Sequence, residues 1–182
     1  SEYSTFTYTS KESDIEVVAE GDIVCTQPQS IGSDKYSVQV APTKDNLSIE
    51  ENTAGNITFK VAGDALSGKL QAIQRPALSF DRSRITVGGN SGEQASVSVN
   101  STFDFTVTAT TSAIEVAKGE SGMVDITVVE PNTTSQERKL GAITVTLVDN
   151  PSCSLSIDVW QRTALAERTM MFYYLGMSLK SF

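Results

Sequence analysis

The stretch Ala142-Ile143-Thr144-Val145-Thr146-Leu147-Val148 alternates apolar and hydroxyl-bearing side chains. Successive side chains of a β-strand point to opposite faces of the sheet, so Ile143, Val145 and Leu147 share one face and the two threonines share the other. One face therefore packs on a core while the other meets water, which is typical of antiparallel sheets. The stretch predicts a half-buried strand.

Similar segments recur on both sides of this strand, separated by turns rich in Gly, Asn, Asp and Pro. The expected strands are residues 85–87, 95–100, 104–110, 113–116, 123–129, 142–148 and 153–160. Roughly seven short strands in some 85 residues predict an immunoglobulin-like β-sandwich. Phe103 and Phe105, two residues apart, are expected on one strand face toward the core.

A self-match divides the chain. Residues 73–77 (Ile-Gln-Arg-Pro-Ala) recur as residues 160–164 (Trp-Gln-Arg-Thr-Ala), an offset of 87 residues from Gln74 to Gln161. Upstream, residues 36–40, 46–50 and 55–61 align with residues 105–109, 112–116 and 122–128. The chain is therefore expected to be all-β: a divergent immunoglobulin-like sandwich at 1–75, a second sandwich at 76–163, and a linker with a C-terminal apolar strand at 164–182.

Composition limits the possible functions. The chain has 14 Lys and Arg against 22 Asp and Glu, which argues against a nucleic-acid partner because such binding needs clustered positive charge. It has no His, which removes the commonest general base and metal ligand. Cys25 and Cys153 lie in different halves and are expected to be free thiols. Neither catalysis nor a metal or other cofactor is expected in this chain.

Residues 77–163 resemble the BACON domain, an immunoglobulin-like module of surface and secreted proteins of gut bacteria. The resemblance lies in residues 101–107, Gly122 with the strand after it, Asn132, residues 138–145 (Arg-Lys-Leu-Gly-Ala-Ile-Thr-Val), and the closing Val-Trp-Gln of residues 159–161. It implies glycan or mucin binding beside an enzyme on the same polypeptide. The tryptophans that this family usually carries near Phe105 and Ala113 are absent here.

Trp160, Gln161 and Arg162 are the candidate interface or ligand residues. If Leu155, Ile157 and Val159 face the core, Trp160 lies on the outer face of its strand. A half-exposed indole offers a large contact area and one hydrogen-bond donor, which suits a neighbouring domain or a ligand. The alternative is that Trp160 folds over the end of the sandwich and covers core.

The C-terminal tail has a different pattern, because apolar residues occupy both parities of its strand: Met170, Met171, Phe172, Tyr173, Tyr174 and Leu175. A strand apolar on both faces is typical of a parallel sheet covered by helices. Arg168-Thr169, this apolar run and Ser178-Leu179 resemble the opening of the clostripain-like cysteine peptidase domain, whose catalytic His and Cys would lie further downstream. Alternatively, the tail pairs with the edge of another molecule's sheet.

These observations predict a non-catalytic N-terminal region of a secreted or surface-anchored bacterial protein. Its sandwiches would space and orient a downstream hydrolase of the clostripain-like kind, with membrane contact only through a lipid anchor on a lost upstream Cys, as in an outer-membrane lipoprotein. The expected partner is the adjacent domain. The alternatives are a glycan- or mucin-binding module acting on its own, and a structural subunit that assembles through its C-terminal strand.

Overall fold

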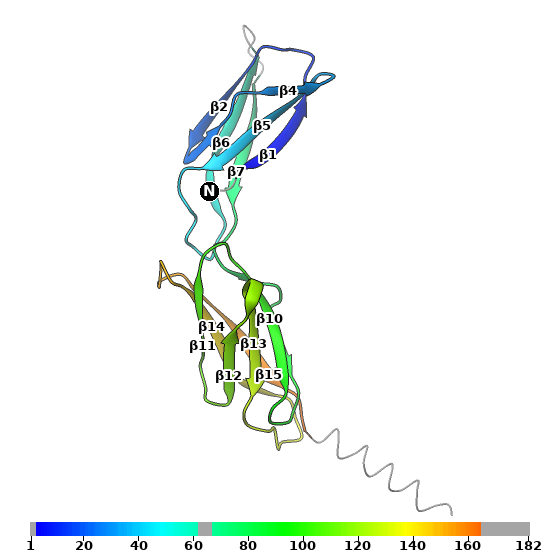
Figure 1. Cartoon of the computed structure of the whole chain (residues 1–182), viewed down its shortest axis with the longest axis vertical. Helices are drawn as coiled ribbons and strands as arrows, with labels where there is room; N and C mark the ends of the chain where they lie inside the picture. The colour runs from blue at the N-terminus through cyan, green and yellow to red at the C-terminus, as the bar shows by residue number, and fades with distance from the viewer. Residues whose placement is uncertain (1–2, 62–66, 165–182) are drawn as a thin grey trace, which may run out of the picture. The chain divides into compact units, whose positions relative to one another are not determined.

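The computed structural model describes residues 3–61 and 67–164. They form β-strands and turns with one short 3-10 helix among them, Glu120–Gly122. The chain divides into two compact units, Ser1–Pro76 (unit 1) and Ala77–Phe182 (unit 2), and the strands of each unit form two layers (Figure 1). The predicted apolar strand with Met170, Phe172, Tyr173, Tyr174 and Leu175 lies outside the described residues.

Unit 2 is a sandwich of two four-stranded sheets. Its strands are β8 (Ser79–Phe80), β9 (Ile85–Val87), β10 (Gln94–Asn100), β11 (Phe105–Ala109), β12 (Ile114–Lys118), β13 (Met123–Val128), β14 (Arg138–Leu147) and β15 (Ser154–Gln161). The sheet orders are β12-β13-β10-β8 and β11-β14-β15-β9. All pairs are antiparallel except β9 with β15. In chain order this is the ABED and CFG arrangement of immunoglobulin domains, with the first strand divided between the two sheets.

The alternation that predicts these strands is confirmed by burial. Ile143, Val145 and Leu147 are at most 1% exposed. Strand β14 begins at Arg138, earlier than predicted, because an irregularity between Lys139 and Gly141 interrupts the alternation. The two-residue β8 was not predicted.

The expectation for Phe103 is wrong. Phe105 begins β11 and is buried, whereas Phe103 lies in the turn before that strand. The two rings therefore do not share a strand face, because strand geometry starts only at Phe105.

Unit 1 has the same sandwich plan with fewer strands. These are β1 (Ser4–Thr9), β2 (Ile15–Gly21), β3 (Ile23–Cys25), β4 (Gln29–Gly32), β5 (Lys35–Pro42), β6 (Asn52–Val61) and β7 (Ser67–Gln74). One sheet has the order β1-β5-β3, with β4 also paired to β5, and the other has the order β2-β6-β7. The buried core is small: Val17, Ile23, Val38, Ala54 and Ile57.

From their C-terminal ends back to β1 and β10, the two units have the same order of strands, except that β4 has no counterpart in unit 2. Each ends in an antiparallel hairpin, β6–β7 in unit 1 and β14–β15 in unit 2. Strand β6 thus corresponds to β14 and β5 to β13, so the predicted alignments of residues 36–40 and 55–61 with residues 105–109 and 122–128 are wrong. Short strands rich in Val, Ile and Thr resemble one another, and only the pairing partners distinguish them.

Candidate functional site

Trp160 lies on β15 with a partly buried side chain, and its backbone pairs with Lys139 of β14. The guanidinium carbon of Arg84 lies 4.5 Å from the indole centroid, a cation–π arrangement. Arg84 also pairs with Glu137, and Lys139 Nζ lies 2.8 Å from a carboxylate oxygen of Asp158. A basic side chain therefore covers part of the indole, and the surface around it is charged.

Gln161 is fully buried, unlike its neighbours Trp160 and Arg162. Its Nε2 donates to the backbone oxygens of Gly89 and Glu130 at 3.3 and 2.7 Å. Its Oε1 accepts a hydrogen bond from Arg138 Nε at 3.0 Å. The structure therefore uses this amide inside unit 2 and leaves it no surface for a ligand.

Asn132 lies next to Gln161 and is also fully buried. Its Nδ2 donates to the backbone oxygens of Gln136, Arg162 and Gln161 at 2.8, 3.0 and 3.4 Å. Its Oδ1 accepts from the N–H and the hydroxyl of Thr134 at 3.1 and 2.7 Å. This side chain thus ties the loop before β14 to the end of β15, which satisfies backbone groups that burial would otherwise leave unpaired.

Asn46 performs the same task in unit 1. Its Nδ2 donates to the backbone oxygens of Glu50 and Arg75 at 2.8 and 2.9 Å. Its Oδ1 accepts from the N–H and the hydroxyl of Ser48 at 3.2 and 2.8 Å. Asn46 therefore corresponds to Asn132, and the predicted alignment of residues 46–50 with 112–116 is wrong. The sequence does carry the pattern: both loops read Asn-x-Ser/Thr-x-Glu/Gln.

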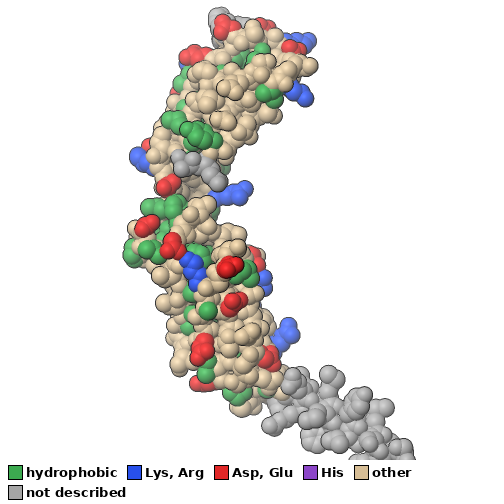
Figure 2. All heavy atoms as spheres, in the orientation of Figure 1, with side chains coloured by type: hydrophobic (Ala, Val, Ile, Leu, Met, Phe, Trp, Pro, Cys, Tyr) green, Lys and Arg blue, Asp and Glu red, His purple; other side chains and the backbone are tan. Residues whose placement is uncertain are grey.

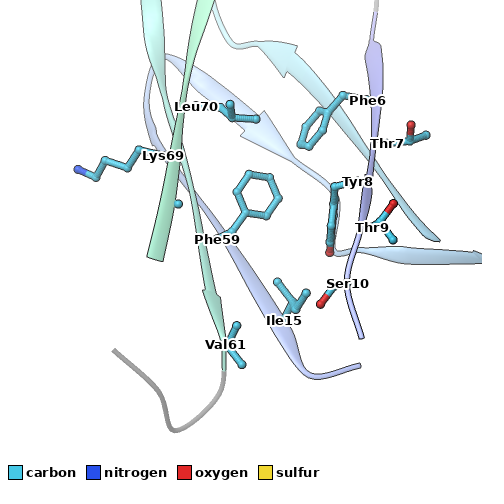
Figure 3. Close-up of a pocket in the computed structure, with 11 residues that line it drawn as sticks. Phe6, Thr7, Tyr8, Thr9, Ser10, Ile15, Phe59, Val61, Lys69 and Leu70 are labelled. Atoms are coloured by element: carbon cyan, nitrogen blue, oxygen red, sulfur yellow. The ribbon is translucent and has the colours of Figure 1, made fainter. Parts of the chain in front are cut away.

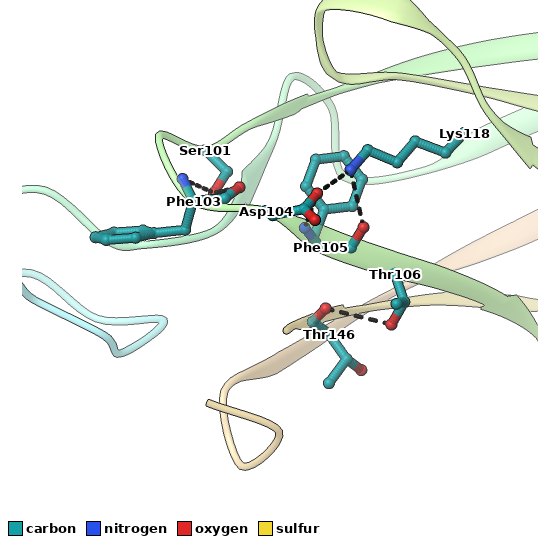
Figure 4. Close-up of polar contacts among 7 residues, drawn as sticks. All are labelled: Ser101, Phe103, Asp104, Phe105, Thr106, Lys118 and Thr146. Carbon is teal, nitrogen blue, oxygen red and sulfur yellow. Dashed lines mark hydrogen bonds and ion pairs between the residues drawn. The ribbon is translucent and has the colours of Figure 1, made fainter. Parts of the chain in front are cut away.

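Polar side chains also connect the turn before β11 with β12 (Figure 4). The carboxylate of Asp104 accepts hydrogen bonds from the Lys118 ammonium group and from the Phe105 N–H. Lys118 Nζ donates to the Phe105 oxygen at 3.0 Å and lies 4.3 Å from the centroid of its ring. The hydrogen bond from Lys118, followed by that from Phe105, holds the pKa of Asp104 below its usual value.

A pH titration of stability tests this contact. The pKa of Asp104 is lower in the folded state than in the unfolded chain, so its contribution is present above the unfolded value, near 3.9, and is lost as the pH falls through the folded value. We expect Asp104→Asn to flatten the decline in the free energy of unfolding of unit 2 below about pH 5. Lys118→Met is expected to flatten it in the same way. A decline unchanged in both variants, measured by urea unfolding at several pH values, contradicts the assignment.

The described residues contain little catalytic equipment. Cys25 and Cys153 are free and lie in different units, and burial raises the pKa of both thiols, which disfavours the reactive thiolate. In residues 3–61 and 67–164, no group of three or more His, Cys, Asp or Glu side chains is placed to hold a metal ion. None of the helices in those ranges is long and apolar enough to cross a membrane.

The charged side chains are dispersed. On the face drawn in Figure 2, Lys and Arg lie among Asp and Glu, and no large cluster of one sign forms. Several are in exposed ion pairs, such as Lys44 with Asp22 at 2.9 Å and Arg82 with Asp81 at 2.7 Å. Exposed pairs of this kind contribute little to stability, because water and salt screen their charges.

An apolar cleft opens in unit 1 between β1 of one sheet and β6 and β7 of the other (Figure 3). Its volume is about 470 Å³. The aromatic rings of Phe6 and Tyr8 lie 5.6 and 5.2 Å from the ring of Phe59, centroid to centroid. Leu70 lines the cleft as well, whereas the Lys69 side chain points away from the rings. Phe6 and Tyr8 stand two residues apart in the sequence, which suits one face of a strand but does not by itself reveal a cleft.

The strand orders and sites of both units define tandem immunoglobulin-like β-sandwiches. No family model matches the sequence, and no curated protein matches it. Solved structures that are similar to the chain include an endo-fucoidan hydrolase of glycoside hydrolase family 107 (10% identity, TM-score 0.37, 89% of this chain and 26% of that one). Another is that of zebrafish RET cadherin-like domains 1 to 4 (11% identity, TM-score 0.38, 89% of this chain and 42% of that one). A third is that of titin domains I67–I69 (10% identity, TM-score 0.34, 89% of this chain and 60% of that one). The chain thus spans between about a quarter and three fifths of the length of these three chains.

Proposed function

We propose that this chain is the non-catalytic N-terminal region of a secreted or surface-anchored bacterial protein, in which two BACON-type sandwiches space and orient a downstream clostripain-like cysteine peptidase. The observation that carries the proposal is the succession of two immunoglobulin-like units without a reaction centre among the described residues, ahead of the Arg-Thr and apolar run of residues 168–175. The sandwiches supply separation and orientation, and the chemistry belongs to the downstream domain.

The residues that carry the BACON resemblance support the proposal through their contacts. Asn132, Arg138 and Gln161 are widely spaced in sequence, but their side chains bind one another or the same loop. They therefore form the hydrogen-bonded end of the sandwich. These residues stabilise the fold and present no side chain to a ligand, which fits a spacer domain better than a receptor domain.

Glycan binding has weaker support, because Trp160 is partly covered by Arg84 and the rings of Phe6, Tyr8 and Phe59 line the cleft of unit 1. A sugar platform needs an open aromatic face.

The intact polypeptide in its source cells tests the proposal. We expect an antibody against residues 3–164 to detect a secreted or cell-surface protein much heavier than the 19.5 kDa of this chain. The purified protein is expected to hydrolyse peptides and to lose this activity on thiol alkylation, whereas residues 1–182 alone are inactive. A mature product of 19.5 kDa, or a heavier one without peptidase activity, contradicts the proposal.

A further inference from the structure

Two strand edges border the cleft of unit 1, and each has one partner among the described residues. Strand β1 pairs with β5, and β7 pairs with β6. In unit 2 the corresponding edges, those of β10 and β15, are occupied: β8 pairs with β10, and β9 pairs with β15. An unoccupied edge leaves a row of backbone donors and acceptors that can pair with another strand.

Equivalent positions of the two units differ in burial where the described residues of unit 1 provide no counterpart of β8 and β9. Leu70 stands four residues before Gln74, and its cross-strand partner is the buried Ile57. In unit 2, Ile157 stands four residues before Gln161, and its partner is the buried Ile143. Leu70 and Ile157 are therefore equivalent positions. Both side chains therefore belong on the inner face of their sheets. Yet Leu70 is 50% exposed, whereas Ile157 is 4% exposed. The sandwich of unit 1 is open at this edge.

Residues on the other wall of the cleft, formed by β1, can also be matched to residues of unit 2. Val38 and Val124 each stand eight residues before the buried asparagine of their unit, Asn46 or Asn132. Their cross-strand partners, Phe6 and Val97, are therefore equivalent. Two residues further on, Tyr8 corresponds to Val99, which in unit 2 pairs with Phe80 of β8.

Tyr8 supplies a second, polar indication. Its hydroxyl oxygen is buried and has no hydrogen-bond partner among the described residues. Burial, followed by the nearby Tyr36, raises its pKa. Buried hydroxyl groups rarely lack a partner, and a backbone carbonyl from a strand laid beside β1 is of the kind that would accept this hydrogen bond.

We propose that the cleft of unit 1 is an acceptor site for one extended peptide strand that is not part of residues 1–182. The strand runs antiparallel to β1 and parallel to β7, as β8 and β9 do beside β10 and β15. It carries aliphatic or aromatic side chains at alternate positions, like Leu78 and Phe80 or Ile85 and Val87 in unit 2. Backbone pairing gives affinity, and the apolar wall selects these side chains.

The alternation of inward and outward side chains that a bound strand needs argues against the tail of a second copy as the occupant. In unit 2 the inward Ile85 and Val87 are buried, while Thr86 between them is exposed. A strand in the equivalent place has one face in the core and one in water. The run of residues 170–175 is apolar at both parities and would expose one apolar face there.

A synthetic peptide of residues 77–88 (ALSFDRSRITVG) tests the site, because this segment fills the equivalent place in unit 2. Titrated into the full chain at about 100 times its Kd, it is expected to raise the unfolding midpoint of unit 1 by about 10 °C or more. It is also expected to slow amide exchange in β1 and β7. Trp160 is the only tryptophan and lies in unit 2, so its fluorescence transition is expected to stay in place. A peptide with Ser at positions 78, 80, 85 and 87 serves as the control.

Two matched variants locate the binding. Leu70→Glu is expected to weaken peptide binding at least tenfold, because it places a carboxylate on the cleft wall. Ile73→Glu, on the same strand and 55% exposed but not lining the cleft, is expected to bind as the parent does. Equal binding by both variants overturns the proposal.

Joining the peptide covalently to the chain tests the site even if the free peptide binds weakly. Nine residues, 88–96, separate Val87 from Val97, and residues 77–91 placed directly before Ser1 give the same separation from Phe6. The fusion is expected to raise the midpoint of unit 1 as the peptide does. If neither peptide nor fusion stabilises unit 1, the proposal is wrong. Concentration-dependent dimers that protect β1 and β7 and disappear on deletion of residues 168–182 also overturn it, since the occupant is then a second copy.

Discussion

Asn132→Ala is expected to lower the free energy of unfolding of unit 2 by about 3–5 kcal/mol. The change removes the donor for three backbone oxygens and the acceptor for two groups of Thr134. Because the site is fully buried, water cannot replace these hydrogen bonds without opening the end of the sandwich. Urea unfolding followed by Trp160 fluorescence measures the loss.

Asn100→Ala is the matched control. Asn100 also heads an Asn-x-Ser/Thr triplet, but it is exposed at the end of β10, and its replacement is expected to change stability by less than about 0.5 kcal/mol. Asn46→Ala is expected to destabilise unit 1, which has no tryptophan, and to leave the Trp160 transition unchanged. A loss below about 1 kcal/mol for Asn132→Ala shows that its hydrogen bonds do not stabilise the hairpin end.

Ile157→Ala and Leu70→Ala are expected to differ strongly although the two positions are equivalent. Ile157 is 4% exposed, and truncating a buried Ile leaves a cavity and costs about 2–5 kcal/mol. Leu70 is 50% exposed, so its truncation is expected to cost about 1 kcal/mol, in line with partial burial of an aliphatic side chain. Trp160 fluorescence reports the first loss, and near-UV dichroism of the unit 1 tyrosines reports the second. Similar costs at both positions contradict an open cleft at Leu70.

Much of unit 2 could be predicted because its strands are regular. The alternation through Ile143, Val145 and Leu147 is a local property and survives in the sequence. Strand β8 could not be found in this way, since two residues are too short for a period of two to appear. Arg138 was placed before its strand because the irregularity near Gly141 breaks the pattern.

The sites depended on contacts that no local pattern contains. Trp160 is partly buried, whereas the neighbouring Gln161 points to the other face of the strand, is fully buried and makes three hydrogen bonds. The cleft of unit 1 results from two edges that have no further partner among the described residues. Strand pairing is a tertiary property, and the sequence of β1 or β7 alone does not reveal it.

The buried asparagines have a consequence for recombinant production. Asn46 and Asn132 each head an Asn-x-Ser/Thr triplet, which is the acceptor for N-glycosylation in eukaryotic secretion. An oligosaccharide attached to Nδ2 before folding would replace one of its hydrogens and add a bulky group where Asn132 is fully enclosed. Yeast or mammalian secretion is therefore expected to give misfolded material. A bacterial host avoids the modification, and a secreted form with the two triplets removed at Ser48 and Thr134 avoids it at Asn46 and Asn132.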